Sequence, residues 1–115
     1  MSSISGTFTV SADVASDTRI VGSPYPVVGT VTLDFTSSSF AGNVVLKKRK
    51  INSASSATWK ACTYQTSDST TDIAASTPIT GDKTAYVRLD GEELSYTANT
   101  VTAGSLAVEW AWSAG

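Results

Sequence analysis

Histidine does not occur in the 115 residues of this chain. Its absence removes the commonest general base, the commonest zinc ligand and every catalytic triad that depends on imidazole. Cysteine occurs once, as Cys62, so the chain can form neither an internal disulfide nor a cysteine-based metal cluster. Since no histidine is available to activate Cys62, a buried, unreactive side chain is favoured over a nucleophile. We therefore expect no enzymatic activity, no cofactor and no metal site.

Charge and long hydrophobic runs are also scarce. Only 16% of the residues are charged and the formal net charge is -2, which provides no overall attraction to nucleic acid or to an anionic membrane. No apolar run approaches the roughly 20 residues that a membrane-spanning helix needs, and residues 1–6 lack the features of a secretory signal. We expect a soluble, unprocessed chain that folds without disulfides into one domain over residues 1–115.

What the sequence does contain is short-range alternation of apolar and polar residues. No stretch of helical length has a helical pattern, whereas period-2 alternation recurs along the chain. This predicts an all-β fold, an antiparallel two-sheet β-sandwich of about seven strands, jelly-roll-like or Ig-like. The predicted strands are residues 6–11, 29–36, 42–51, 58–66, 84–90, 93–98 and 105–113. Residues 13–28 are predicted to form a long surface loop.

Two of the predicted strands have a clear inner face. Apolar and polar residues alternate cleanly in 29–36 and 105–113, which predicts one buried and one solvated face. The predicted inner-face residues are Val31, Leu33, Phe35, Leu106, Val108, Trp110 and Trp112. In residues 58–66 either parity could face inward, and we favour the one that buries Trp59.

Three carboxylates surround one predicted hairpin turn, at Asp90, Glu92 and Glu93. Paired carboxylates are the catalytic groups of glycoside hydrolases. A hairpin tip is solvated, however, and offers no apolar pocket that would raise the pKa of one member of the pair. We interpret these three residues as an exposed turn.

The run Lys47-Lys48-Arg49-Lys50 holds half of the eight cationic residues. In a strand, Lys47 and Arg49 share one face while Lys48 and Lys50 share the other. A sandwich strand can bury neither pair, so we expect this end of the strand to project beyond the core or to lie at an edge. There it either discourages uncontrolled strand addition or makes a salt-sensitive contact with an acidic partner. Binding of nucleic acid is not expected, because few other cations accompany the run.

Two aromatic residues are further candidates for contact with a partner. Tyr25 lies between Pro24 and Pro26, which predicts an exposed and rigidly held ring. Trp112 shares the parity of the core residues but lies near the end of the chain, where it could pack on a neighbouring chain. Exposed aromatic rings are also stacking platforms for sugars, so a carbohydrate-binding module is the alternative hypothesis.

Four segments follow a pattern found in small phage virion proteins: residues 40–49 (FAGNVVLKKR), 58–60 (TWK), 85–89 (AYVRL) and 104–109 (GSLAVE). In that pattern an aromatic-x-Gly strand is followed by a loop and by a Trp that opens the next strand. Residues 29–113 resemble these proteins, although residues 55–57 (SSA) replace the glycine usual in that loop. The resemblance implies a virion-associated structural protein, with no catalytic residues and no cofactor.

Together these observations predict a non-enzymatic structural protein of a bacteriophage virion, most simply a capsid decoration (cement) protein. Its expected partners are the major capsid protein or neck and tail proteins, with no nucleic acid and no membrane. It would fold in the host cytoplasm and assemble into the virion as a homo-oligomer, for which a trimer is a common form. The alternative is a carbohydrate-binding or host-adsorption module of a tail or head fibre.

Overall fold

The computed structural model describes residues 3–21, 27–50, 58–66 and 77–114. These residues form strands and connecting turns, without a helix among them. The strands are β1 (Ser3–Val10), β2 (Val14–Val21), β3 (Val27–Lys50), β4 (Lys60–Ala61), β5 (Gln65–Thr66) and β6 (Lys83–Ala114). Accordingly, the described part of the chain contains no helix that could span a membrane.

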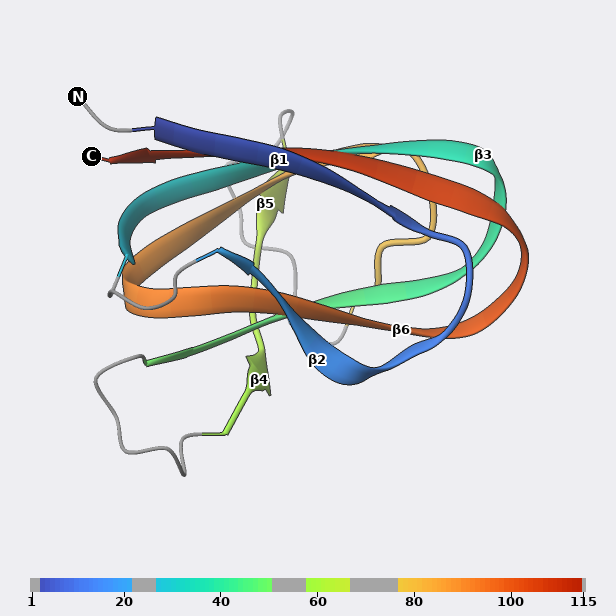
Figure 1. Ribbon diagram of the computed structural model, residues 1–115, viewed down its shortest axis with the longest axis horizontal. Coiled ribbons are helices and arrows are strands. Elements are labelled where there is room, and N and C mark those ends of the chain that lie inside the picture. The colour runs from blue at the N-terminus through green and yellow to red at the C-terminus, as the bar shows by residue number, and fades with distance from the viewer. Residues whose placement is uncertain (1–2, 22–26, 51–57, 67–76, 115) are drawn as a thin grey trace.

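Two strands, β3 and β6, are long enough to bend and pass through the fold more than once (Figure 1). β3 bends at Ser39, and β6 bends near Gly91 and again over residues 100–104. Each bend contains residues with positive φ: 55° at Ser39, 73° at Gly91, 56° at Thr100 and 65° at Gly104. The left-handed backbone conformation turns the strand while its hydrogen-bonded ladder continues on either side.

The bends divide β3 into residues 27–38 and 40–50, and β6 into residues 83–90, 92–99 and 105–114. Residues 27–38 lie between two of the β6 segments, because Leu33 is the partner of both Ala85 and Trp110. Residues 40–50 pair with residues 92–99, as Lys47 does with Ser95. Partner numbers fall along β6 as they rise along β3 in each of these ladders, so the neighbouring segments are antiparallel.

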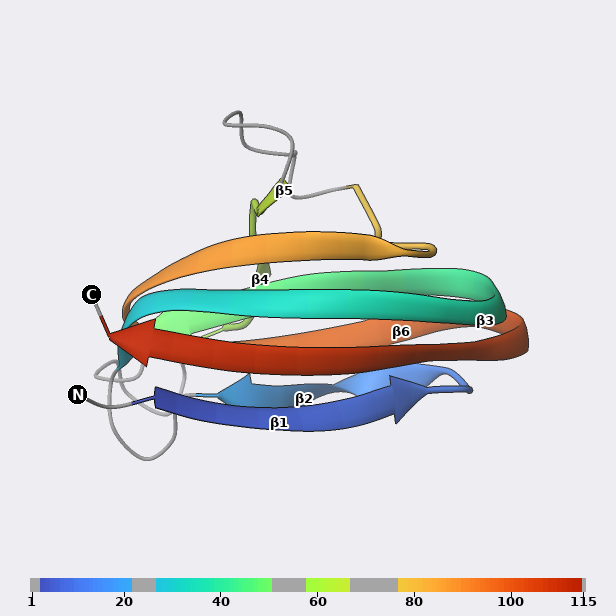
Figure 2. The same ribbon diagram turned by 90° about the horizontal axis from the view of Figure 1, so that it is seen from above.

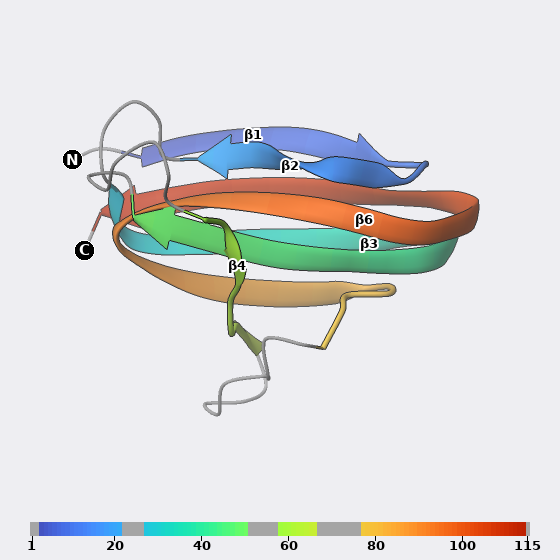
Figure 3. The same cartoon turned by 90° about the horizontal axis from the view of Figure 1, so that it is seen from below.

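The prediction of an all-β, antiparallel fold is confirmed. The arrangement of about seven strands in two separate sheets is not confirmed, because β3 and β6 run continuously through their bends and join six strands of the described residues into one open sheet. Figures 2 and 3 show β1 and β2 together at one side of the molecule and β5 at the opposite side. β1 pairs with residues 106–113 of β6, and β2 pairs with residues 94–98.

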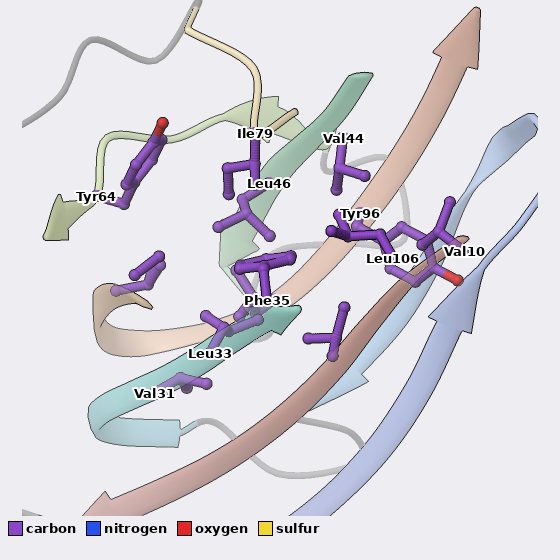
Figure 4. Packing of buried hydrophobic residues seen from close by; sticks show 14 of the residues in the cluster. Val10, Val31, Leu33, Phe35, Val44, Leu46, Tyr64, Ile79, Tyr96 and Leu106 are labelled. Atoms are coloured by element: carbon purple, nitrogen blue, oxygen red, sulfur yellow. The ribbon is translucent and has the colours of Figure 1, made fainter. Parts of the chain in front are cut away.

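The hydrophobic core lies between the bent halves of this sheet (Figure 4). Val31, Leu33 and Phe35, predicted as core, are fully or almost fully buried, and Val44 and Leu46 from the second half of β3 join the same cluster. Leu106 and Val108 are buried as predicted. The alternation in the sequence therefore identified the inner face of both strands correctly.

Two local predictions were wrong. Residues 14–21, predicted as part of a long loop, form β2, whose two ends are anchored by partly buried Val14 and by buried Val21. The intervening polar side chains, which are exposed, concealed this strand in the sequence. In residues 58–66 the structure buries Cys62 and Tyr64, while Ala61 and Thr63 are exposed, so the inward parity is the opposite of the one that we favoured.

Candidate functional site

The basic run lies at the end of β3, where Lys47 and Lys48 have partners on both sides. They face Ser95 and Leu94 of β6 on one side, and Ala61 and Lys60 of β4 on the other. This part of β3 is therefore not a free edge, because β4 covers it. The cations alternate between the two faces as predicted. Lys47 and Arg49 lie on the outer face, and Lys48 and Lys50 extend toward the bend at Gly91.

On the outer face, two ionic contacts connect β2 to β3 across the central segment of β6. The Nζ of Lys47 lies 3.3 Å from Oδ1 of Asp17. The carboxylate of Glu93 is held between two arginines, with 2.7 Å from Nε of Arg19 to one oxygen and 2.7 Å from Nε of Arg49 to the other. Two of the four cations in the run are thus neutralised within the chain.

Glu93 is the most deeply buried charged residue among those described. Only 4% of its surface is exposed, whereas a solvated turn was predicted at this position. Burial alone raises the pKa of its carboxyl, but the hydrogen bonds and positive charges of Arg49 and Arg19 outweigh burial and hold the pKa below its ordinary value. Glu93 therefore stays ionised and serves as an ionic anchor rather than as an acid that donates protons.

The aromatic ring of Trp59 packs against the guanidinium of Arg49, one of the two arginines that hold Glu93. The guanidinium carbon of Arg49 lies 4.3 Å from the centroid of the Trp59 ring, a cation–π contact. Trp59 is half-buried in this position, outside the core cluster. The residue predicted to open a core strand thus supports the charge network on the outer face.

Lys48 and Lys50 extend away from the outer face and contact residues on both sides of the bend at Gly91. The Nζ of Lys48 lies 3.4 Å from Oε1 of Glu92 and donates to the carbonyl oxygen of Arg88 at 3.2 Å. The Nζ of Lys50 donates to the carbonyl oxygen of Asp90 at 3.0 Å. All four cations of the run therefore have partners inside the protein, which lowers the charge that they present to solvent.

A polar groove of about 460 Å³ opens beside Lys48, between the short strand β5 and residues 86–92 of β6. Its lining residues are Thr30, Lys48, Thr63, Tyr64, Gln65, Tyr86, Arg88, Asp90 and Glu92. The two cations and the two carboxylates balance one another, so the groove carries no formal net charge. Such a lining suits an uncharged polar ligand better than an ion.

Some hydrogen-bonding groups of the groove remain available. Within the described parts of the chain, the Arg88 guanidinium, the Asp90 carboxylate and the Tyr86 hydroxyl have no hydrogen-bonded or ionic partner. Sequence reasoning missed Tyr86 and Arg88 as site residues. The signal was present, because both alternate with the buried residues Ala85, Val87 and Leu89 and must therefore face outward.

The predicted aromatic contacts do not gather at this groove. Trp110 and Trp112 are partly buried and pack against the core. Each indole occupies space that a glycine leaves open: a Cβ added to Gly6 would lie 2.9 Å from the Trp110 ring, and one added to Gly29 would lie 2.9 Å from Nε1 of Trp112. Tyr25 lies outside the described residues.

Cys62 is a buried residue of the core cluster. Burial raises the pKa of the Cys62 thiol to about 11, so the thiol is protonated at neutral pH. Glu92 and Glu93, as neighbours in a strand, point to opposite faces. In the described part of the chain, no three acidic or thiol side chains are placed to hold a metal ion together.

Comparison with known protein families finds no match, and neither the curated proteins nor the solved structures include a significantly similar chain. The resemblance to small phage virion proteins consequently remains a prediction from the sequence pattern.

Proposed function

We propose that this chain is a non-enzymatic structural protein of a bacteriophage virion, a capsid decoration protein that binds the major capsid lattice. The observation that carries the proposal is the placement of the segments that follow the virion-protein pattern. Residues 40–49 pair with β4, which begins directly after Trp59. Residues 85–89 and 106–109 flank the same half of β3, residues 29–38. The segments that follow the pattern are thus neighbours within one sheet.

The polar surface of the sheet supports an attachment role. Hydroxyl-bearing side chains of β1, β3 and β6 share the outer face around residues 29–36, and they are exposed or half-buried: Thr7, Thr9, Thr30, Thr32, Thr36 and Thr84. Removing a hydroxyl from water costs less free energy than removing a charge, and the lost hydrogen bonds can be replaced by a partner. Such a surface is suited to repeated attachment on a symmetric lattice.

Particle binding tests the proposal directly. Mass spectrometry of purified virions should detect the chain, and cryo-electron microscopy should place it on the capsid. Particles that lack the chain should bind the purified protein to saturation in co-sedimentation, whereas unassembled capsid protein should not. Absence from the virion together with no saturable binding to particles contradicts the proposal; detection only in the neck or tail moves the attachment site there.

The basic run provides a second measurement on the same particles. If Lys47–Lys50 still contact an acidic lattice partner, binding should weaken as salt rises above about 0.15 M, where screening acts within roughly 8 Å. Lys50→Gln, which removes an exposed cation, should reduce this salt dependence, while Lys83→Gln, at the start of β6 and away from the run, serves as the matched control. Binding that does not respond to salt or to Lys50→Gln would leave the run with its intramolecular role alone.

A carbohydrate-binding module is the second candidate, and the groove beside Lys48 favours it. Its balanced charge, its hydroxyl groups and the unpartnered side chains of Arg88 and Asp90 match the way in which proteins bind sugar hydroxyls. Glycan-array binding should be lost in Arg88→Gln/Asp90→Asn and retained in Glu109→Gln, because Glu109 lines a different hollow and is not among the residues of this groove. A glycan that binds both variants equally well does not occupy this groove, and an array without hits counts against the module.

A further inference from the structure

The strand β1 forms an edge of the sheet that carries none of the usual protection. It pairs with β6 on one side, and no described strand lies on its other side. Its eight residues, SISGTFTV, include no charge and no proline. An edge strand of this kind presents unpaired N–H and C=O groups that can bind a further strand.

The other edges differ. β2 carries Asp17 and Arg19, and its pairing with β6 is interrupted by two irregularities, between Val14 and Thr18 and between Arg19 and Val21. β4 and β5 have only two residues each. Charges, bulges and short length are the features that prevent strand addition. Among the edge strands β1, β2, β4 and β5, β1 is therefore the one that lacks these features.

We propose that β1 is a self-association surface, on which β1 of a second copy of this chain pairs in antiparallel orientation across a two-fold axis at Gly6. This pairing places Ile4 opposite Phe8 of the partner subunit and Ser5 opposite Thr7 of the partner subunit. The pairing joins β1 and residues 105–114 of one copy to the same strands of the other copy in one continuous sheet.

The chemistry of β1 supports a second copy as the partner. In a two-fold pair, a strand meets its own sequence, so any charge would be repeated on both sides of the axis. The absence of charge in β1 removes this repulsion. Ile4 is 49% exposed and Phe8 is only partly buried, so the pairing covers apolar surface that the single chain leaves accessible. Ser5 and Thr7 meet as hydroxyl-bearing neighbours on the outer face.

The geometry also limits assembly to two copies. Phe8 is fixed by stacking on Tyr96, with ring centroids 4.5 Å apart and an interplanar angle of 13°. At the proposed axis Gly6 has no side chain, and the Trp110 indole fills the space beneath it. Once the two β1 strands pair, the remaining edges are the charged, irregular β2 and the sides of β3 and β6 that β4 and β5 cover in part, where Lys50, Arg88 and Asp90 add charge. The association therefore closes instead of growing into a fibre.

The test uses charge reversal on the purified full chain. Ser5→Lys/Thr7→Lys and Ser5→Glu/Thr7→Glu each place like charges opposite one another across the axis. Each variant should sediment as a monomer at concentrations where the unchanged chain is a dimer, and an equal mixture should restore the dimer because lysines then face glutamates. Ser16→Lys/Thr18→Lys on β2 is the matched control and should remain dimeric.

Cysteine cross-linking provides a second measurement that does not depend on the charged variants folding. An oxidised mixture of Ser5→Cys and Thr7→Cys chains should form a disulfide-linked dimer, whereas neither variant alone should do so. The proposal is overturned if the unchanged chain is a monomer or trimer, if the mixture of charge variants stays monomeric, or if Thr7→Cys cross-links to itself. Because no particle is present, these results are independent of virion binding and can fail while that proposal stands.

Discussion

Arg19 and Glu93 are 74 positions apart in the sequence, yet Nε of Arg19 donates to Oε1 of Glu93 at 2.7 Å. Arg49 binds the other oxygen of the same carboxylate, so one buried acidic group connects β2, β3 and β6. The edge strand β2 has mostly exposed side chains, and this contact fixes it to the sheet where its apolar contacts are few.

Replacing the buried carboxylate should destabilise the fold. Glu93→Gln removes the charge that both arginines bind, and we expect a loss of about 2 kcal/mol in the free energy of unfolding. Urea denaturation followed by fluorescence measures the change. Glu109→Gln, at an exposed position, should change stability by less than about 0.5 kcal/mol. Equal effects of the two substitutions would contradict the anchoring role of Glu93.

The lowered pKa of Glu93 also indicates how the free energy of unfolding should depend on pH. The pKa of Glu93 in the folded protein lies below its ordinary value of 4.5. The unfolded chain therefore binds a proton first as the pH falls, so the contribution of Glu93 is fully present above that value and is lost toward the lower folded-state pKa. Urea denaturation at a series of pH values should show stability falling below about pH 4.5. The decline should be shallower in Glu93→Gln; parallel curves would assign it to other carboxylates.

Three glycines separate the effect of backbone conformation from that of space. Gly81 has no atom within 4 Å of an added Cβ and no positive φ, so Gly81→Ala should be nearly neutral. Gly91 has equally open surroundings but a φ of 73°, so Gly91→Ala should cost about 1 kcal/mol. Gly104 combines a φ of 65° with a Cβ position 2.2 Å from the carbonyl oxygen of Ser39, and Gly104→Ala should cost at least about 3 kcal/mol.

Thermal or urea unfolding of the three alanine variants checks this order. Gly104 lies directly against the backbone of Ser39, where the bend of β6 meets the bend of β3. An added Cβ would force these two bends apart, so the largest loss is expected there. Equal losses at Gly91 and Gly104 would show that positive φ alone sets the cost. A loss at Gly81 comparable to the others would contradict the structural explanation.

The thiol of Cys62 should be unreactive in the folded protein. Its residue is 5% exposed, and burial raises the thiol pKa from 9.0 to about 11. The higher pKa alone lowers the thiolate fraction about 100-fold at mildly alkaline pH. Labelling with a chromogenic disulfide reagent should therefore be at least about 100-fold slower in the native protein than in urea. Equal labelling rates in the two states would contradict the burial of this thiol.

Some of the predictions from sequence failed for an identifiable reason. Alternation revealed the inner faces of residues 29–36 and 105–113, because a strand with one buried face must alternate. It failed for β2, where consecutive exposed residues show no pattern, and for residues 58–66, which cross between parts of the sheet as two short strands. Glu93 was predicted to be solvated because the sequence does not show that Arg19 and Arg49 converge on it.

The strand-forming character of the chain and the alternation of faces in the basic run could be read from the residues alone, because both follow from the two-residue repeat of an extended backbone. Which groups those faces contact depends on the folded arrangement. The bends at Ser39, Gly91 and residues 100–104 joined the predicted strands into one sheet. They also brought Asp17, Arg19 and Glu93 to the cations of β3. Side chains distant in sequence become neighbours only through such register, and a local pattern carries no information about it.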